Sequence, residues 1–301
     1  MNDTINVACP SCGLDKSKNL ATVKLSPIGI ESSLMRCAGC QLAYVSPRPT
    51  LESEKNFYAT KHYELEDENS WRVNRLPFFK WALELVASRS EGRKLLDVGC
   101  GGGFFMDLAR SNGWEVEGTE ISEGGIRQAQ GLKLKVVKGE LGQAGLKKSS
   151  YSVVTLWNVL DQMMDPKNEI ETVFKLVEPG GLVALRVSNL TFHLGMHRIW
   201  NFLQRTPLAG RLKNKPTVFH LEMFDERSMT RFLMAAGFHS VTVKNSLLDG
   251  NNEVLRNLFT KTGARAVACC GYLIAELVRG LSGGLAVIGP SLFVIARKPH
   301  E

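Results

Sequence analysis

Between residues 94 and 296 the chain alternates short apolar runs with amphipathic segments. The runs are bounded by glycine, proline or polar residues and are typical of buried strands, whereas the intervening segments have helical spacing. The predicted strands are 94–98, 115–119, 133–137, 152–157, 182–187, 240–245 and 291–296. The predicted helices lie within 71–90 and at 104–111, 123–130, 167–177 and 226–236. This alternation predicts an α/β protein with a mostly parallel sheet covered on both faces.

The first 50 residues have a different character. They contain two C-x-x-C pairs, in which Cys9 precedes Cys12 and Cys37 precedes Cys40. Two such pairs in turn-forming contexts predict four thiolates around one structural Zn²⁺, in a closed site that has no open coordination position. Four free thiols or one redox pair are the alternatives. We predict a zinc-ribbon-like lobe over 1–50, a linker over 51–70 and an α/β domain over 71–301.

A glycine-rich turn follows the first strand of the α/β domain. Asp97 ends the apolar run, and Gly99, Cys100 and Gly101 lead into the next helix. Bare backbone beside a helix N-terminus favours a bound ligand. The dinucleotide fingerprint requires a third small residue, and that position falls on Phe104. The stretch therefore fits a different nucleotide-linked ligand better.

S-adenosylmethionine is the competing candidate. Asp97 is placed for its cationic end, and Glu120, about 20 residues further on, is placed for the two ribose hydroxyls. Glu120 alone would serve NAD equally well. Glu140 follows the third strand, where a carboxylate could reach the adenine amine.

Further stretches continue the series in order: Tyr151 to Leu160 around the fourth strand, and Val177-Glu178-Pro179-Gly180-Gly181 before the fifth. Together with the Asp97 to Gly101 turn, they resemble the seven-strand S-adenosylmethionine-dependent methyltransferases from about Trp71 to Asn245, plus the last strand. The resemblance implies a Rossmann-like, doubly wound seven-stranded sheet with an antiparallel last strand.

The resemblance also implies how the cofactor is bound. Gly99 and Gly101 would let the methionine part lie on the backbone, and Ile121 would pack on the adenine. Glu140 and Leu141 would close over the base, and Asn158 would face the methionine end. The order of the cysteine pairs, the Tyr44 to Pro49 stretch and the α/β domain is similar to bacterial methyltransferases of glycan and secondary-metabolite clusters, which implies a small or glycan-type acceptor.

The stretch after the fourth strand departs from the pattern of that group. In that group an acid and then a His usually follow the fourth strand, but here Gln162 follows Asp161. Methyl transfer needs chiefly alignment, with a base only for a protonated nucleophile such as a hydroxyl. Candidate bases are Asp161, His193, His197 and His220, with His220 preferred because its loop is expected over the cleft. His220 could equally bind the linker, and Asp161 could orient its loop.

Two insertions suggest a surface role. The segments 193–215 and 252–289 combine apolar stretches with basic residues, so they predict either contact with a membrane or lipid-linked substrate, or a lid or homodimer face. The apolar stretch 264–285 is interrupted by Arg265, Glu276 and Arg279, so it is not expected to span a membrane.

The amino-acid composition bears on where the protein acts and on the charge of its partners, but it selects no single function. The chain has seven cysteines and no basic, apolar leader, which fits the cytoplasm, with peripheral contact at the inner membrane surface as an extension. Its net charge of +7 permits an anionic partner without selecting one. We expect O-methylation of a small acceptor, with RNA methylation disfavoured because the positive charge is not concentrated in the cysteine lobe. A non-catalytic cofactor-binding protein is the third alternative.

Overall fold

A computed structural model describes residues 4–25, 29–53, 68–206, 217–247, 273, 277–278, 280–282 and 287–300. The predicted linker 51–70 falls largely outside these residues, as do most of the insertion 252–289 and the end of the insertion 193–215. Within the described residues, no helix is both long and apolar enough to cross a membrane.

The main sheet has seven strands in the order β12-β13-β10-β9-β6-β7-β8. They are β6 (Lys94–Val98), β7 (Glu115–Glu120), β8 (Val136–Lys138), β9 (Tyr151–Trp157), β10 (Val177–Ser188), β12 (His239–Asn245) and β13 (Ser291–Arg297). The pairs β6–β7, β7–β8, β6–β9 and β9–β10 are parallel, and β13 runs antiparallel to β10 and β12. The predicted Rossmann-like sheet with an antiparallel last strand is confirmed.

Several element boundaries differ from the sequence prediction, as in β10, which spans Val177–Ser188 and not 182–187. Two of these differences have a clear local reason. The third strand begins at Val136 and not at residue 133, because Lys133 has a φ of 57° and belongs to the turn that ends α4 (Glu123–Gly131). The helix expected over 167–177 is α5 (Pro166–Leu176), which starts earlier because the Asp165 side chain accepts a hydrogen bond from the Asn168 N–H.

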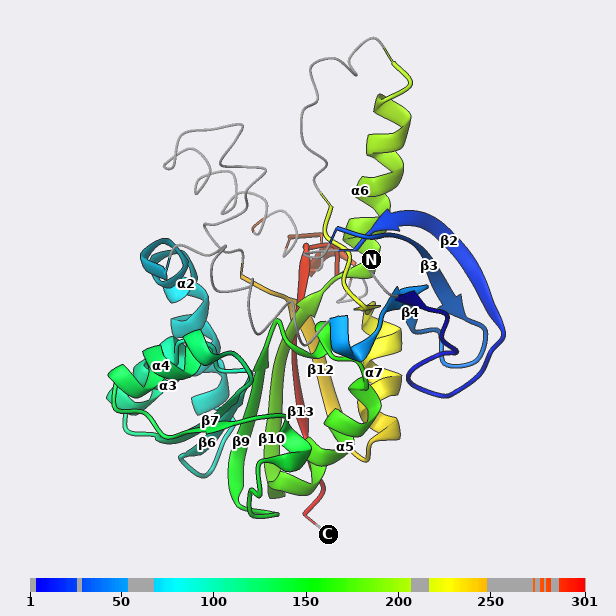
Figure 1. The fold of residues 1–301 in the computed structure, drawn as a ribbon. Helices are drawn as coiled ribbons and strands as arrows, with labels where there is room; N and C mark the ends of the chain where they lie inside the picture. The colour runs from blue at the N-terminus through cyan, green and yellow to red at the C-terminus, as the bar shows by residue number, and fades with distance from the viewer. Residues whose placement is uncertain are drawn as a thin grey trace.

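Helices cover both faces of the sheet (Figure 1). On one face lie α2 (Glu68–Ala87), α3 (Phe104–Ser111) and α4, and an aromatic cluster that includes Phe78, Phe105, Trp157 and Phe293 joins α2 and α3 to the strands. On the other face lie α5 and α7 (Glu226–Ala235). Helix α6 (Leu190–Leu203) begins just after β10 and projects away from the sheet.

The N-terminal lobe is built on a second, antiparallel sheet with the order β11-β4-β3-β2. Its strands are β2 (Ser17–Lys24), β3 (Glu31–Cys37), β4 (Ala43–Ser46) and β11 (Glu222–Met223), and β1 (Thr4–Ile5) pairs separately with β5 (Arg48–Pro49). Strand β11 comes from the α/β domain and pairs Glu222 with Tyr44. The lobe is therefore completed by a strand that lies far away in the sequence.

The lobe and the α/β domain share one interior. A buried cluster joins Leu34 and Val45 of the lobe to Leu190 on α6 and to Phe219 and Met223. At roughly 25 cal/mol per Å² of buried apolar surface, such a cluster stabilises the docked arrangement. The lobe is thus a fixed part of the molecule, positioned against α6 and α7.

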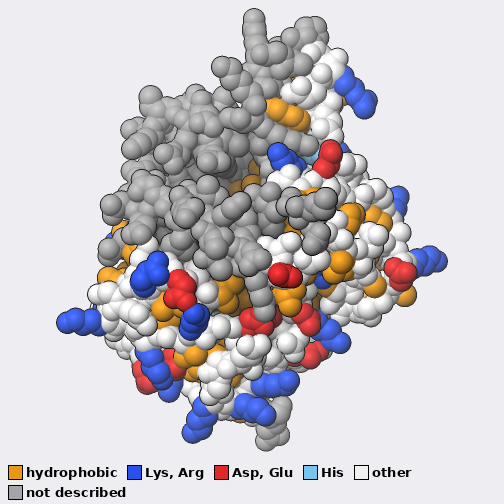
Figure 2. All heavy atoms as spheres, in the orientation of Figure 1, with side chains coloured by type: hydrophobic (Ala, Val, Ile, Leu, Met, Phe, Trp, Pro, Cys, Tyr) orange, Lys and Arg blue, Asp and Glu red, His pale blue; other side chains and the backbone are white. Residues whose placement is uncertain are grey.

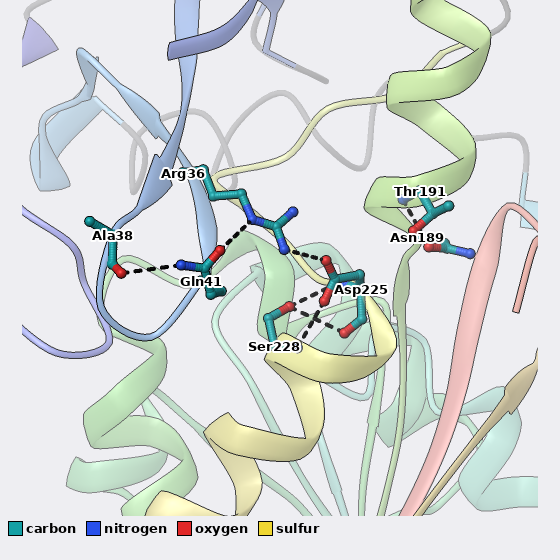
Figure 3. Close-up of polar contacts among 7 residues, drawn as sticks. All are labelled: Arg36, Ala38, Gln41, Asn189, Thr191, Asp225 and Ser228. Atoms are coloured by element: carbon teal, nitrogen blue, oxygen red, sulfur yellow. Dashed lines mark hydrogen bonds and ion pairs between the residues drawn. The ribbon is translucent and has the colours of Figure 1, made fainter. Parts of the chain in front are cut away.

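Two ion pairs reinforce this interface. Arg48 Nη1 donates to Glu222 Oε1 at 2.9 Å and Arg48 Nη2 donates to the Met164 carbonyl at 3.0 Å, with both charged side chains buried. Arg36 Nη2 contacts Asp225 Oδ2 at 2.6 Å, at the start of α7, where Asp225 and Ser228 form a capping box (Figure 3). The lobe therefore contacts the N-terminus of α7 and the loop that follows β9.

Arg48→Ala should destabilise the protein by about 3–5 kcal/mol, because it leaves the Glu222 carboxylate buried without that guanidinium. Arg36→Ala is the matched control: its ion pair is partly exposed, so a loss of about 1 kcal/mol or less is expected. Urea unfolding followed by fluorescence measures both free energies of unfolding. An equal loss of unfolding free energy in the two variants would show that the buried ion pair stabilises the protein no more than the partly exposed one.

Candidate functional site

The turn between β6 and α3 requires glycine. Gly99, Gly101 and Gly103 have φ values of 65°, 54° and 77°, a region that disfavours L side chains. At Gly99 a Cβ would lie 2.8 Å from Cγ2 of Val159, so the loop after β9 packs directly on this turn. The predicted ligand loop is therefore a tight, glycine-dependent turn at the carboxyl end of β6, an inner strand of the sheet.

Cys100 contributes to this turn through its backbone. Its N–H donates to the Thr119 carbonyl at 3.0 Å, and its buried side chain packs with Met106, Ala129 and Leu134. Burial raises the pKa of the Cys100 thiol well above its usual range. This thiol is therefore neutral, and the predicted role of Cys100 in cofactor binding stays a prediction.

Asp97 lies beneath the turn and is only 2% exposed. Thr155 Oγ1 donates to Asp97 Oδ1 at 2.6 Å, which fixes the carboxyl group. Burial raises the pKa of Asp97 to about 7, a value that includes the lowering effect of the Thr155 hydrogen bond and the raising effect of nearby Glu120. A ligand cation placed beside Asp97 would favour its ionised form.

The affinity for S-adenosylmethionine should therefore rise with pH between about 6 and 7 and then level off. Below its pKa the free protein carries a proton on Asp97 that must be released on binding, which weakens the affinity by up to about tenfold per pH unit. Isothermal titration in buffers of different ionisation enthalpy measures the affinity and the released proton. Asp97→Asn should bind more weakly and without this pH dependence; a pH response retained in the variant would contradict the assignment.

Glu120, at the end of β7, closes the turn from the neighbouring strand. Its Oε2 accepts from the Gly101 N–H at 2.8 Å, and its Oε1 accepts from the N–H groups of Ile121 at 2.9 Å and Ser122 at 2.8 Å. The side chain is 8% exposed. Glu120 therefore ties β7 to the glycine turn, a role that the sequence did not reveal.

The predicted adenine end lies beyond β7 and β8. Ile121 is 42% exposed, Leu141 is buried, and Glu140 is half-buried just before the short 3-10 helix Leu141–Gln143. Burial raises the pKa of Glu169 on α5 to about 7, with further contributions from Glu140 and Asp165. Adenine binding by Ile121, Glu140 and Leu141 stays a prediction.

Asn158 ends β9 with a φ of 60°, an unusual value for a residue that is not glycine. Its N–H donates to the Arg186 carbonyl at 2.9 Å, and its carbonyl accepts from Gln162 Nε2 at 2.6 Å. Its Oδ1 accepts from Arg75 Nη1 at 3.3 Å and from Arg186 Nη1 at 3.4 Å. Both arginines were missed at the sequence level, although a charged residue inside the apolar strand around Arg186 was a usable signal.

Asp161 is fully buried, in the short 3-10 helix Leu160–Gln162. Its Oδ2 accepts from the Ser188 N–H at 2.8 Å, which joins the ends of β9 and β10. This geometry favours the alternative in which Asp161 orients the loop over the one in which it takes a proton from a substrate. The catalytic assignment of Asp161 receives no support from its position.

The three histidines occupy different environments. His193 Nδ1 accepts from the Val218 N–H at 3.2 Å, so its Nε2 carries the proton and donates to the Pro290 carbonyl at 3.1 Å. Burial, together with His220, lowers the pKa of His193 to about 4, so it stays neutral and structural. His197 is buried against Phe219, whereas His220 is half-buried in the loop before β11. His220 is the least buried of the three, and its role as a base stays a prediction.

The four cysteines of the lobe converge. Their Sγ atoms all lie within 4.8 Å of one another, with Cys9 to Cys40 at 3.4 Å and Cys12 to Cys37 at 3.5 Å. Zn–S bonds of about 2.3 Å in a tetrahedral site place sulfur atoms roughly 3.8 Å apart, so this donor set fits zinc. Cys9 and Cys37 are buried and Cys12 is exposed, which is the geometry of a structural site at the edge of a small lobe.

The sheet order, the glycine turn and the acidic residues at the strand ends define the class of Rossmann-like S-adenosylmethionine-dependent methyltransferases. The chain belongs to the methyltransferase domain family, whose model matches residues 63–243. This match confirms the family that the glycine turn and the following stretches predicted.

Curated relatives match only part of the chain. A ubiquinone biosynthesis O-methyltransferase of Pseudomonas fluorescens is 33% identical over 132 residues, covering 42% of this chain and 53% of the relative. One of Bordetella avium is 29% identical over 117 residues, covering 36% and 48%. The chain thus spans about half the length of the curated relatives that it matches.

Solved structures support the fold. A SAM-dependent methyltransferase of Thermotoga maritima has a TM-score of 0.52 at 15% identity, covering 81% of this chain and 99% of that one. Phosphoethanolamine N-methyltransferase 2 of Haemonchus contortus, in complex with S-adenosyl-L-methionine, has a TM-score of 0.53 at 14% identity, covering 85% and 63%. At these identities the likeness concerns the fold alone.

Proposed function

We propose that the protein transfers a methyl group from S-adenosylmethionine to an oxygen atom of a small acceptor. The observation that carries this proposal is the glycine turn held between Asp97 and Glu120, inside a chain of the methyltransferase domain family. The curated relatives are named O-methyltransferases, which supports oxygen as the acceptor atom.

The chain's residues would act mainly by positioning. The sulfonium of the cofactor supplies an electrophilic methyl group. Gly99 and Gly101 provide bare backbone for its methionine part, Glu120 accepts from the ribose hydroxyls, and Asp97 faces the cationic end. In such a reaction alignment of the reacting atoms can account for much of the acceleration.

A hydroxyl nucleophile also needs a group to accept its proton, and we assign this role to His220. Both ring nitrogens of His193 are engaged by the backbone and Asp161 is fully buried, so neither is available to a substrate in this conformation. His220→Gln should lower kcat while leaving the cofactor affinity within about twofold. A parallel fall in cofactor affinity would point to a structural role instead.

Different observations bear on the acceptor. A glycan-type or lipid-linked acceptor rests on the resemblance of the lobe and core to cluster methyltransferases, and RNA is the alternative. Among the described residues on the face shown in Figure 2, Lys and Arg side chains are interspersed with Asp and Glu. This mixed distribution supports a small molecule over RNA as the acceptor.

The experiment that tests the function has two stages. Isothermal titration of the zinc-loaded chain with S-adenosylmethionine should show one binding site per chain, and absence of binding would refute the proposal. Transfer of a labelled methyl group to a cell extract should then give a product that partitions with small molecules or lipids. Cofactor binding without transfer to any fraction would support the non-catalytic alternative.

We further propose that the four lobe cysteines hold a structural Zn²⁺ and that the protein acts in the cytoplasm.

A separate proposal concerns the segments 193–215 and 252–289, which would contact the inner membrane surface or form a homodimer. Its support within α6 is the exposure of Ile199 and Phe202, at 51% and 68%. In a flotation assay, the protein should be recovered with anionic vesicles, and Phe202→Ser should reduce the amount recovered. Size-exclusion chromatography tests whether the protein is a dimer.

A further inference from the structure

One side chain of the lobe bridges two separate segments of the α/β domain. Arg48, on β5, is only 6% exposed. Its Nη1 donates to Glu222 Oε1 at 2.9 Å, and its Nη2 donates to the Met164 carbonyl at 3.0 Å. The planar fork of arginine holds two such acceptors in fixed directions, which a lysine ammonium on its flexible stem cannot do. The guanidinium therefore sets the position of the two segments relative to each other.

One of these segments is the loop between β9 and α5, which packs on the cofactor turn. At the start of the loop, Val159 lies so close to Gly99 that a Cβ there would be 2.8 Å from Val159 Cγ2. In the middle of the loop, Asp161 Oδ2 accepts from the Ser188 N–H at 2.8 Å. The lobe arginine therefore binds the far end of a loop whose near end lies against the cofactor turn.

The other segment carries His220, to which we assign the role of base. Phe219 forms a parallel bridge with Leu25 of the lobe, and the Leu221 carbonyl accepts from the Val45 N–H at 2.9 Å. Strand β11, which follows, pairs with β4 of the lobe sheet. The lobe therefore fixes the backbone on both sides of His220.

A backbone contact at the end of β10 connects the two segments a second time. The Leu190 N–H donates to the Phe224 carbonyl at 2.8 Å, two residues beyond Glu222. Two residues before Leu190, the Ser188 N–H donates to Asp161 in the loop after β9. The contacts thus form a closed path from the arginine through β11, the end of β10 and the loop after β9, and back to the arginine.

We propose that Arg48 is a positioning residue for methyl transfer, which holds the segment that carries His220 at a fixed distance from the cofactor turn by way of the loop after β9. The lobe then serves as part of the acceptor side of the site and not only as a support. This inference rests on the proposed function for the role of His220. Alignment matters because a displacement of about 1 Å near the reacting atoms can cost roughly 100-fold in rate.

The first arm of the test measures hydrogen exchange in the zinc-loaded full chain. Arg48→Lys keeps a positive charge beside Glu222 but lacks the fork, so it should fold and lose the contact with Met164. We expect exchange to become about tenfold faster or more in residues 159–165 and 219–224, because the loss of a fixed contact favours local opening.

The second arm measures the rate of labelled methyl transfer from S-adenosylmethionine to a cell extract. Arg48→Lys should lower the maximal rate about tenfold and leave the KM for S-adenosylmethionine within about twofold, because the cofactor turn itself is unchanged. In the His220→Gln background, the same substitution should change the rate by less than about twofold, because the group that Arg48 positions is already missing. A purely structural role would lower the rate by the same factor in both backgrounds.

Arg36→Lys is the matched control, because Arg36 belongs to the same lobe and contacts Asp225, which lies beyond the closed path (Figure 3). It should leave the exchange in both segments and the rate of transfer unchanged. If Arg48→Lys fails to fold, Glu222→Gln weakens the other contact of the guanidinium and should show the same dependence on His220.

Unchanged exchange in both segments of Arg48→Lys, or equal rate losses with and without His220, would overturn the proposal. Failure of the unmodified chain to transfer a methyl group to any fraction would instead refute the proposed function. The exchange measurement needs no acceptor, so it then still decides whether Arg48 holds the two segments together.

Discussion

Cys37→Ser is expected to abolish zinc binding and to unfold the N-terminal lobe. Cys37 is fully buried at the end of β3, where its Sγ lies 3.5 Å from that of Cys12. A lobe of this size has little core of its own, so its metal site contributes directly to its folding free energy. Loss of the site should reduce the free energy of unfolding by at least about 3 kcal/mol. Because each kcal/mol shifts the Tm of a chain of this size by about 2–4 °C, the Tm should fall by roughly 10 °C.

Inductively coupled plasma mass spectrometry should find about one zinc per unmodified chain, and calorimetry measures the Tm. The control is Cys100→Ser, which also replaces a buried cysteine but lies outside the cluster, so it should retain the metal. Removal of zinc by a chelator should reproduce the loss of stability. A protein purified without zinc that has the same Tm as the zinc-loaded form would contradict the assignment.

The effect should extend beyond the lobe, because β11 pairs with β4 and Arg36 contacts the start of α7. Hydrogen exchange in residues 221–228 should therefore accelerate in Cys37→Ser, while β9 at the centre of the main sheet should stay protected. Acceleration restricted to residues 4–49 would show that the lobe unfolds without consequence for the α/β domain.

The centre of the main sheet was predictable because its inner strands β6, β9, β10 and β13 are largely buried on both faces. Such strands are continuous apolar runs bounded by turns, and those around Leu95, Val153 and Leu292 stand out in the sequence. The glycine turn was equally visible, since a positive φ at Gly99 and Gly101 leaves a compositional trace. Both signals depend only on residues that are neighbours in the sequence, so they can be recognised without knowing the rest of the fold.

Long-range pairing left no such trace. Strand β11 has two residues, too few for any period, and its Glu222 lies 174 positions from its partner Arg48. The convergence of Arg75 and Arg186 on Asn158 likewise depends on which strands and helices become neighbours. The sequence therefore indicated which residues could serve the cofactor, but not which residues hold those residues in place.

Glu120 has both a role predicted from the sequence and a contact that only the structure shows. Its substitution should lower the cofactor affinity more than any other substitution in the cofactor site. Its carboxylate was predicted to accept from the ribose hydroxyls, and in the structure it also accepts three backbone N–H groups, one of them from Gly101 across the strand gap. Glu120→Gln replaces one carboxylate oxygen, which accepts hydrogen bonds, by an amide NH₂, which donates them. That NH₂ would face a backbone N–H or a ribose hydroxyl in place of the lost acceptor. We expect the affinity for S-adenosylmethionine to fall by about 100-fold, or about 2.7 kcal/mol.

Glu117→Gln distinguishes this effect from a general loss of stability. Glu117 lies on the same strand, is 9% exposed, and binds Tyr151 Oη at 2.8 Å and Lys135 Nζ at 2.8 Å. Its replacement should reduce the free energy of unfolding by about 1–3 kcal/mol, because it weakens the contacts of a buried polar group. Its affinity for the cofactor should stay within about twofold of the unmodified chain.

A cofactor analogue completes the argument about Glu120. If the carboxylate accepts from the ribose, the 2′-deoxyribose analogue of S-adenosylhomocysteine should bind the unmodified chain more weakly than S-adenosylhomocysteine itself, and Glu120→Gln should reduce that difference. If Glu120 only anchors the turn, the variant should weaken both ligands equally, because the Gly101 N–H loses its acceptor whichever sugar is bound. Titration of both ligands into both proteins gives the coupling free energy directly, and a value near zero would assign Glu120 to the turn alone.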